Sequence, residues 1–239
     1  MSLKHLFYRL PYGMRRGVYA LARSREYRKM QWQRRNTTTN GYTLSSFDDL
    51  RCIFVHIPKT AGVSVCRALF GNLAGAHRPI FEYQIVFRQR EFDSYFKFTF
   101  VRNPWDRVHS AYRFLQAGGM NDWDAAWARE FLRPYHSFEH FVREGLGRPE
   151  VQRWIHFRPQ SFFLTVPGQH HTDHLDFIGR FETLEADFKH VAAQLGLTGA
   201  TLPHVNATPG AVVAADDLDA ATRDTVARLY RDDVKLLGY

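Results

Sequence analysis

The chain has 239 residues, 45% of them hydrophobic and 23% charged, with a formal net charge of +8. This composition is typical of a globular protein with one domain, or one domain and an appendage, and it excludes wholesale disorder. The two cysteines, Cys52 and Cys66, are too few for a disulfide scaffold, and we expect both to be small buried apolar groups. No apolar run approaches the ~18 residues of a membrane-spanning helix, and basic residues interrupt the region where a secretion signal would lie. These features predict a cytoplasmic protein.

The positive charge is concentrated at the start of the chain. Residues 1–40 hold ten Lys or Arg side chains and one acid, whereas the rest of the chain holds 22 basic and 23 acidic groups. We therefore expect a basic helical extension and linker over residues 1–45 and a nearly neutral domain over residues 46–239. A polybasic segment attracts anionic lipid, acidic polymer or nucleic acid, although it also occurs as a solvated segment that only aids solubility. Peripheral contact with an anionic membrane is one hypothesis for this extension, and specific nucleic-acid recognition is not expected.

Hydrophobic periodicity predicts the elements in chain order. Residues 1–35 have the spacing of one or two basic amphipathic helices, and residues 36–46 have the composition of a polar linker. Strands are predicted at 52–57, 95–101 and 175–181, and helices at 64–73, 103–115, 138–144, 184–195 and 218–237. Ser137 and Thr183 are predicted N-caps, while Gly118-Gly119 and Gly196 are predicted helix ends. The alternation predicts an α/β fold, with a mainly parallel central sheet covered by helices on both faces.

The segment Pro58-Lys59-Thr60-Ala61-Gly62-Val63-Ser64 follows the first buried strand and opens the next helix. A helix N-terminus presents unpaired N–H groups and a partial positive charge, so such a turn is suited to an anion. Gly62 permits close approach of the backbone, Lys59 adds a point charge, and Thr60 and Ser64 add hydroxyl donors. The lysine precedes the glycine, so the GxxxxGK[ST] pattern of nucleotide hydrolases is absent. The alternative is a surface lysine and a serine that only caps the helix.

A second segment, Phe100-Val-Arg-Asn-Pro-Trp-Asp-Arg-Val-His-Ser110, joins the second strand to a helix. Arg102 stands at the carboxyl end of the strand, where open α/β sheets bind their ligands. Asn103 is a suitable N-cap, and Arg107, Ser110 and Phe114 share one helix face. An arginine in the loop and a hydroxyl in the helix suit a phosphate group. The alternative is an arginine that only ties the loop to Asp106.

Taken together, the two segments resemble the nucleotide-binding motifs of sulfotransferases that use 3′-phosphoadenosine-5′-phosphosulfate (PAPS), specifically the carbohydrate branch related to heparan sulfate uronyl sulfotransferases. The resemblance covers most of residues 50–239 and implies a P-loop-like three-layer fold. It implies that Arg102 and Ser110 bind the 3′-phosphate. It also implies that the 5′-phosphosulfate is bound by six consecutive residues: Lys59, Thr60, Ala61, Gly62, Val63 and Ser64. Val63 stands where the family usually carries Thr, so Ser64 is expected to take a larger share of that contact.

The resemblance also implies a reaction. A sulfuryl group would move by in-line displacement to a hydroxyl, or less often an amine, of a saccharide, glycoconjugate or small-molecule acceptor, releasing the bisphosphate product PAP. Lys59 would stabilise the bridging oxygen of the leaving group, and no metal would be needed. His77 is the first candidate for the base because family members often carry a histidine at this place, and Glu82 is the second. His56 and His109 are expected to face other surroundings.

Other readings of the sequence remain open. The chain would alternatively be a P-loop-like nucleotide or phosphate kinase, or a non-catalytic module that binds PAP or polyanions. The histidines at 170, 171 and 174 lack a known metal-ligand spacing, and a solvated loop is the expected structure there. Aromatic residues between 116 and 160 would stack on sugar rings or pack in the core: Trp123, Trp127, Tyr135 and Trp154.

Overall fold

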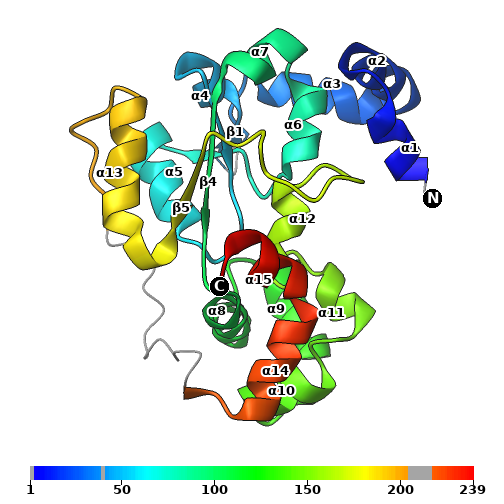
Figure 1. Cartoon of the computed structure of the whole chain (residues 1–239), viewed down its shortest axis with the longest axis vertical. Helices are drawn as coiled ribbons and strands as arrows, with labels where there is room; N and C mark the ends of the chain where they lie inside the picture. The colour runs from blue at the N-terminus through cyan, green and yellow to red at the C-terminus, as the bar shows by residue number, and fades with distance from the viewer. Residues whose placement is uncertain (1–2, 39–40, 204–216) are drawn as a thin grey trace. The chain divides into compact units, whose positions relative to one another are not determined.

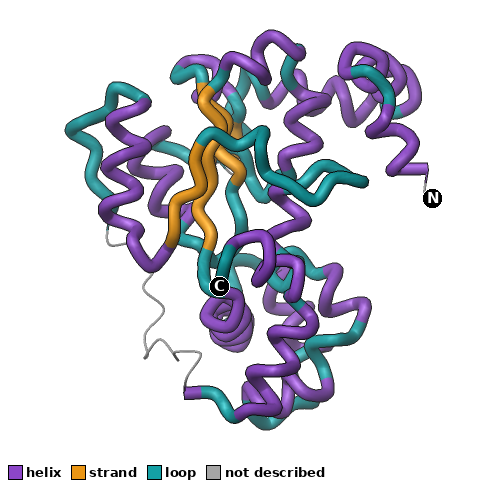
Figure 2. Tube along the Cα trace, viewed as in Figure 1, coloured by secondary structure: helices purple, strands orange, loops and turns teal. Residues whose placement is uncertain are grey.

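The computed structural model describes residues 3–38, 41–203 and 217–239, and the chain forms two compact units. Unit 1 comprises Met1–Ile57, Ala61–Val101 and Phe162–Pro203. Unit 2 comprises Pro58–Thr60, Arg102–Ser161 and His204–Tyr239. In Figure 1 the elements of each unit are labelled, and Figure 2 shows that the strands (orange) gather in unit 1. Within the described part of the chain, no helix combines the length and the apolar character needed to cross a membrane.

The centre of unit 1 is a parallel sheet with strand order β2-β4-β5. These strands are Cys52–Val55, Phe96–Val101 and Phe177–Arg180. All four residues of β2 are buried, and the rings of Phe54 and Phe98 stack across the pair at 5.0 Å. Strands buried on both faces need apolar side chains throughout, which is why these runs do not alternate with polar residues. The predicted parallel α/β sheet is confirmed.

A smaller parallel sheet in unit 1 pairs β1 (Tyr42–Thr43) with β3 (Leu73–Ala74). The polar segment 36–46 therefore is not only a linker, because it contributes a strand and the start of a helix. The polar side chain of Thr43 holds this segment in place, because its hydroxyl donates to the Gln33 carbonyl and lies 3.0 Å from the Ser45 hydroxyl. Short polar strands of this kind carry little hydrophobic periodicity for a sequence prediction to detect.

Helices surround the central sheet of unit 1. Figure 1 shows α5 and α13 on one side of it and α6 on the other. The helices and the 3₁₀ turn of this unit are α1 Leu3–Arg9, α2 Tyr12–Ala22, α3 Ser24–Gln33, α4 Ser45–Asp49, α5 Gly62–Phe70, α6 Ile80–Val86, α7 Gln89–Ser94, η1 Phe181–Thr183 and α13 Leu184–Gln194. The predicted cap of α13 is wrong: the Thr183 side chain caps no N–H group and instead donates to Asp187.

The first segment of the chain forms three helices, where one or two were predicted for residues 1–35. These helices pack against α6 in unit 1. The hydroxyl of Tyr12 donates to the Phe87 carbonyl at 3.2 Å, and Gln31 donates to the Val86 carbonyl at 2.8 Å. At the end of this segment, Arg34 forms ion pairs with Asp48 and Glu91. The basic segment is therefore folded onto its unit rather than left as a solvated arm. The predicted boundary between residues 45 and 46 stays a prediction.

Unit 2 is helical, and its helices are α8 Pro104–Gln116, α9 Asp122–Phe131, α10 Phe138–Glu144, α11 Pro149–Arg153, α14 Ala220–Leu229 and α15 Arg231–Leu237. A further helix, α12 (Gln160–Leu164), spans the boundary with unit 1. Ser137 caps α10 as predicted, because its side chain accepts the His140 N–H group. The single helix predicted at 218–237 is wrong, since it is interrupted at Tyr230.

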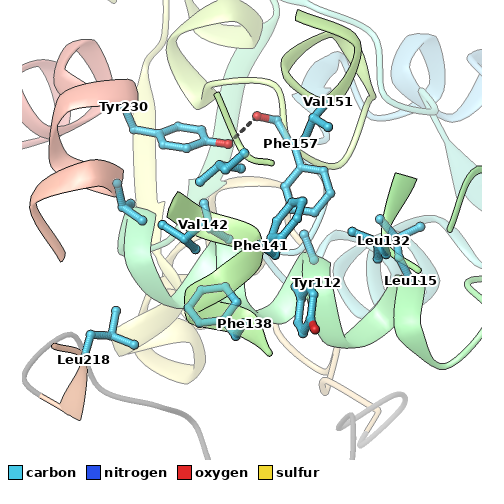
Figure 3. Packing of buried hydrophobic residues seen from close by; sticks show 14 of the residues in the cluster. Tyr112, Leu115, Leu132, Phe138, Phe141, Val142, Val151, Phe157, Leu218 and Tyr230 are labelled. Carbon is cyan, nitrogen blue, oxygen red and sulfur yellow. Dashed lines mark hydrogen bonds between the residues drawn. The ribbon is translucent and has the colours of Figure 1, made fainter. Parts of the chain in front are cut away.

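Aromatic and aliphatic side chains from α8, α10 and α14 form the core of unit 2 (Figure 3). Tyr112 stacks on Phe141 at 5.3 Å, and Phe141 in turn contacts Phe157. The buried Tyr230 donates to the Phe157 carbonyl at 2.6 Å, as the dashed line in Figure 3 shows. Tyr230 lies between α14 and α15, and this hydrogen bond satisfies a phenol that would otherwise be buried without a partner. We therefore attribute the interruption between the two helices to this contact.

Candidate functional site

The loop after β2 has an unusual backbone. Lys59 and Ala61 have φ angles of +70° and +65°, in the left-handed region that residues other than glycine rarely adopt. Each such residue costs about 1–2 kcal/mol, and such strain concentrates at ligand-binding sites. α5 begins directly after Ala61, at Gly62, two residues earlier than predicted. The loop therefore enters its helix through a turn that the surrounding structure must hold in place.

Gly62 is required by packing against a neighbouring ring. A Cβ atom at this position would lie 1.9 Å from the Cδ2 atom of His56. The His56 ring is buried, stacks on Phe54 at 5.6 Å and meets the edge of the His77 ring at 4.3 Å. Within unit 1, His56 thus lies in the core as expected, and it fills the space against which α5 starts.

His77, the first candidate base, is half-buried in unit 1. Its Nδ1 atom lies 3.2 Å from the His56 carbonyl oxygen. Because a carbonyl only accepts hydrogen bonds, this contact is a hydrogen bond in the tautomer that carries the ring proton on Nδ1. Glu82, the second candidate, forms an ion pair with Arg78 at 2.8 Å. The carboxylate of Glu82 is thus engaged by Arg78, and the assignment of His77 as the base stays a prediction.

In unit 2, the ammonium group of Lys59 lies over the ring of Phe114, 3.8 Å from its centroid. Burial and the positive charge of Arg102 lower the pKa of Lys59 to about 8, against the opposing effect of Asp124. Among the described residues, no carboxylate forms an ion pair with Lys59. Lys59 and Arg102 are thus close enough in this unit to oppose each other's charge.

One face of α8 supports the loop residues that belong to unit 2. Arg107 is fully buried and donates to the carbonyl oxygens of Pro58 at 3.4 Å and His156 at 3.2 Å. Phe114, seven residues later, contacts Lys59. Ser110 stands between these two on the same helical face, because residues three and four apart are neighbours on a helix. The sequence pattern placed Arg107, Ser110 and Phe114 on one face, and the structure confirms that arrangement.

Arg102 follows β4 directly and is buried in unit 2. Its N–H group donates to the Gln160 side chain at 3.0 Å, and its carbonyl accepts from the same side chain at 2.7 Å. The N–H groups of Gln160 and Ser161 donate in turn to Asp233 at 2.7 and 2.8 Å. Burial raises the pKa of Asp233, whereas Arg107 and the two N–H groups lower it. These partners fix the backbone on both sides of the Arg102 side chain.

A buried pair, Asp124 and His156, lies behind Phe114 in unit 2. The Nε2 atom of His156 is 3.2 Å from Oδ1 of Asp124, and the His156 ring is 5.0 Å from the Phe114 ring. Burial lowers the pKa of His156, although the hydrogen bond to Asp124 opposes this effect. Gly119 is needed beside them, because it has a φ of +70° and a Cβ there would lie 2.1 Å from the Asp124 Cβ. Asp124 is the acid that opposes the positive charges around Lys59.

Sequence reasoning missed Gln160, Asp233, Asp124 and His156. Asp233 is far along the chain from the strand end that it supports, so no local pattern marked it. The Gly118-Gly119 pair was the one local feature that could have indicated a close neighbour such as Asp124. From the sequence, this pair was interpreted only as a helix end. Buried polar partners of this kind depend on tertiary contacts, and sequence spacing carries little information about them.

The predicted site residues divide between the units. Unit 2 contains Lys59, Thr60, Arg102 and Ser110, and of these Thr60 is fully buried. Unit 1 contains Ala61, Gly62, Val63, Ser64 and His77. In α5, Ser64 is buried and Val63 is half-buried. His109 packs against Phe138 at 4.9 Å, and burial, together with the positive charges of Arg113 and Arg102, lowers its pKa.

The aromatic residues proposed for sugar stacking have different environments. Trp127 stacks on Trp154 at 5.0 Å within the core of unit 2, and Tyr135 packs against Phe141. Trp123, by contrast, is 81% exposed at the start of α9, next to Asp124. The described residues include no group of three or more His, Cys, Asp or Glu side chains that could hold a metal ion. Of the four aromatic candidates, Trp123 is therefore the one whose face is open to a ligand.

The side chains gathered in unit 2 are suited to an anionic ligand. The positive charge of Arg102 acts on the ammonium group of Lys59, and burial has already weakened the protonation of that lysine. An anion bound between them would restore that protonation and offset their repulsion. A nucleotide with phosphates at two positions has the matching chemistry, since each cation would meet its own phosphate. The donor set thus fits the bisphosphate portion of the sulfuryl donor inferred from the sequence.

Comparison with known proteins agrees with this chemistry. Carbohydrate sulfotransferase 14 of Mus musculus and that of Homo sapiens are each 28% identical to this chain over 170 residues, covering 60% of the chain and 44% of the relative. An uncharacterized protein of Archaeoglobus fulgidus is 30% identical over 107 residues, covering 44% of the chain and 72% of that protein. The chain spans less than half the length of the two curated sulfotransferases that it matches. No solved structure matches it. A family model described as the sulfotransferase family matches residues 43–239, and the chain therefore belongs to the sulfotransferase family.

Proposed function

We propose that this chain transfers a sulfuryl group from PAPS to a hydroxyl group of a saccharide or glycoconjugate. The observation that carries the proposal is the pair of cations in unit 2, Lys59 and Arg102, whose mutual repulsion contributes to lowering the pKa of Lys59 to about 8. Two cations that follow neighbouring strands, in segments that also carry hydroxyl groups, match a nucleotide with phosphate at both its 3′ and 5′ positions. The parallel sheet with its strand–loop–helix turn is, in this proposal, the core of a P-loop-like three-layer fold.

Each end of the donor has its own set of residues. Arg102 and Ser110 hold the 3′-phosphate, and this contact distinguishes PAPS from nucleotides without that group. The continuous chain segment from Lys59 through Ser64 is assigned to the 5′-phosphosulfate on its resemblance in sequence. The carboxyl ends of β2 and β4 are adjacent in the sheet, with Val55 paired to Thr99, so both motifs begin from the same edge.

The donor supplies the sulfuryl group, and the residues of the chain position the reactants and control charge. The new bond forms between the acceptor oxygen and sulfur while the bond from sulfur to the 5′-phosphate oxygen breaks. Lys59 neutralises the charge that develops on that oxygen. The acceptor proton passes to His77, which is proposed as the base because of its position in the sequence. No step requires a metal ion, so a chelator is expected to leave turnover unchanged.

The acceptor class is inferred from an exposed aromatic ring and from the relatives. Two of the relatives are carbohydrate sulfotransferases. On this chain, Trp123 offers an exposed indole one residue from Asp124, the acid that acts on the Lys59 charge. Sugar rings pack their C–H faces on such exposed indoles. Trp123→Ala is therefore expected to raise the KM for the acceptor severalfold while the affinity for PAP stays unchanged.

Titration calorimetry with PAP and with ATP, followed by a transfer assay with labelled PAPS, tests the proposal. We expect PAP to bind in the micromolar range or tighter and ATP to bind negligibly, because ATP lacks the 3′-phosphate. Comparable affinity for ATP would favour a nucleotide kinase. Tight PAP binding without label transfer to any member of a saccharide panel would favour a non-catalytic PAP-binding module. His77→Ala with unchanged kcat would remove His77 from the reaction while leaving donor binding intact.

A further inference from the structure

The exposed apolar side chains of this protein are unevenly distributed. Among the described residues, seven large hydrophobic side chains are exposed, and five of them belong to the first three helices: Leu6, Met14, Val18, Leu21 and Trp32. Three of these, Met14, Val18 and Leu21, follow one another at the spacing of a single face of α2. Leu21 is 85% exposed, which is unusual for a leucine within a folded unit. We call Met14, Val18 and Leu21 the outer stripe.

The opposite face of α2 is polar and turned toward its own unit. Arg15 donates to the Gln84 side chain at 2.6 Å, and Arg16 donates to the Ile85 carbonyl at 3.0 Å. The Tyr12 hydroxyl is likewise satisfied, by the Phe87 carbonyl. A helix on a protein surface normally buries its apolar stripe and exposes its charges. In α2 the polar groups are used internally and the apolar stripe is left outside.

The outer stripe has open space around it and positive charge beside it. A Cβ added at Gly17, on the same face, would meet nothing within 4 Å. α3 packs beside α2, and Arg25, Arg28 and Lys29 on it are exposed. The single acid among the described residues of the first three helices, Glu26, lies 3.6 Å from Arg23. An occupant of this surface must therefore accept apolar side chains and must itself be negatively charged.

We infer that the outer stripe and the basic side chains of α3 form a docking surface for a bilayer that contains anionic lipid. A helix lying in the interface inserts its apolar face among the acyl chains, while nearby Lys and Arg side chains meet the headgroups. Trp32, which is half exposed at the end of α3, is of the type that anchors at this depth. The inference concerns a surface separate from the donor-binding residues and does not depend on the proposed reaction.

Vesicle sedimentation with the full chain tests the inference directly. We expect binding to vesicles of phosphatidylcholine with phosphatidylserine, and little binding to vesicles of phosphatidylcholine alone. Replacing the outer stripe by Met14→Ser, Val18→Ser and Leu21→Ser together is expected to weaken binding at least about tenfold. Arg28→Gln and Lys29→Gln are each expected to weaken it roughly fivefold. Met120→Ser removes an exposed apolar side chain of unit 2 and serves as the matched control with unchanged binding.

A site-specific probe reports which face is buried. In Leu21→Cys labelled with an environment-sensitive fluorophore, emission is expected to shift to the blue on phosphatidylserine vesicles, whereas the same label at Gln194→Cys on α13 should not respond. The native thiols Cys52 and Cys66 are buried, and burial raises the pKa of both, so they compete poorly for the label. PAP affinity, measured on every variant, verifies that the donor site is intact.

Several outcomes would overturn the inference. Wild-type binding by the outer-stripe variant would show that the apolar face is not inserted. Equal binding to both vesicle types would show that the basic side chains are not used. A dimer in sedimentation equilibrium that the outer-stripe substitutions abolish, without vesicle binding by the native chain, would assign the surface to a second copy of this chain.

Discussion

Buried and half-buried cations occur in both units, but their partners differ. In unit 1, Lys97 is buried and forms an ion pair with Asp176 at 3.0 Å, and it donates to the Tyr95 carbonyl. Arg34 is similarly enclosed between Asp48 and Glu91. In unit 2, Lys59 instead faces the ring of Phe114 and the positive charge of Arg102, and its pKa is lowered to about 8. The first two cations have their counter-charges in the protein, whereas the third has an arrangement that an anion would complete.

Under the proposed function, the difference separates a structural cation from a cation that binds the donor. Burying a charge is unfavourable unless it is paired, so a folded chain normally supplies the partner itself. A cation held without one must be supported by other contacts, and here Phe114 and the loop held by Arg107 supply them. The strained φ angles at Lys59 and Ala61 are consistent with the same conclusion, because local strain persists only where neighbours enforce it. Four predictions test the comparison.

The largest effect is expected when the two lysines, Lys59 and Lys97, are replaced one at a time. Lys59→Ala should reduce kcat by about a thousandfold, because it removes the cation that meets the leaving oxygen. Lys97→Met should instead lower the free energy of unfolding by about 1–3 kcal/mol while kcat of the folded enzyme stays near that of the native chain. The measurements are initial rates with labelled PAPS and urea unfolding monitored by circular dichroism. Near-normal turnover in Lys59→Ala would contradict the comparison.

Arg102 should act on donor recognition rather than on the chemical step alone. Arg102→Ala is expected to weaken PAP binding by about a hundredfold, because a buried charged contact to the 3′-phosphate is lost. Binding of adenosine 5′-phosphosulfate, which has no 3′-phosphate, should change little. Calorimetry with both ligands supplies the measurement, and Arg102→Lys is the matched control that keeps the charge but loses the bidentate geometry. An equal loss for both ligands would remove the 3′-phosphate assignment.

A proton should be taken up when PAP binds near pH 8. The free-state pKa of Lys59 is about 8, and a bound anion raises it, so binding at this pH takes up about half a proton and weakens as the pH rises further. Calorimetry in buffers of different ionisation enthalpy measures the uptake, and Lys59→Met should abolish it. The same depressed pKa makes the charged form unfavourable in the fold, so the ligand-free chain should gain stability between pH 8 and the usual lysine value of 10.5. Uptake that persists in Lys59→Met would assign the proton to another group.

The smallest effect is expected at Phe114. Phe114→Leu keeps an apolar side chain beneath Lys59 but removes the cation–π contact, which contributes about 0.5–2 kcal/mol. We therefore expect PAP affinity to fall about two- to thirtyfold and the pKa of Lys59 to fall further, which moves the pH dependence of binding to lower pH. Phe162→Leu, a substitution in unit 1, is the control for general loosening. An unchanged pH profile in Phe114→Leu would show that the ring contributes only packing.

Local pattern predicted much of the architecture. The three strands of the central sheet, their parallel arrangement and helices α8, α10 and α13 were predicted from apolar runs, helical spacing and punctuating glycines. Helices α6 and α7 were not predicted. They are short, and α6 is buried on nearly all sides, so its sequence shows no contrast between an apolar and a polar face. The break at Tyr230 was also missed, because a buried hydroxyl with a distant carbonyl partner leaves no local signal.

By itself, the sequence determined the chemical types available at two strand ends: a lysine and hydroxyls in one loop, and an arginine with a serine eight residues later in the other. Those types depend on residue identity and spacing along one strand–loop–helix segment. Only the tertiary structure decided that Lys59 would face Phe114 and Arg102, that Gln160 and Asp233 would hold the Arg102 backbone, and that α2 would turn its apolar stripe outward. The reason is physical: burial and charge depend on what packs around a side chain, and those neighbours come from distant parts of the chain.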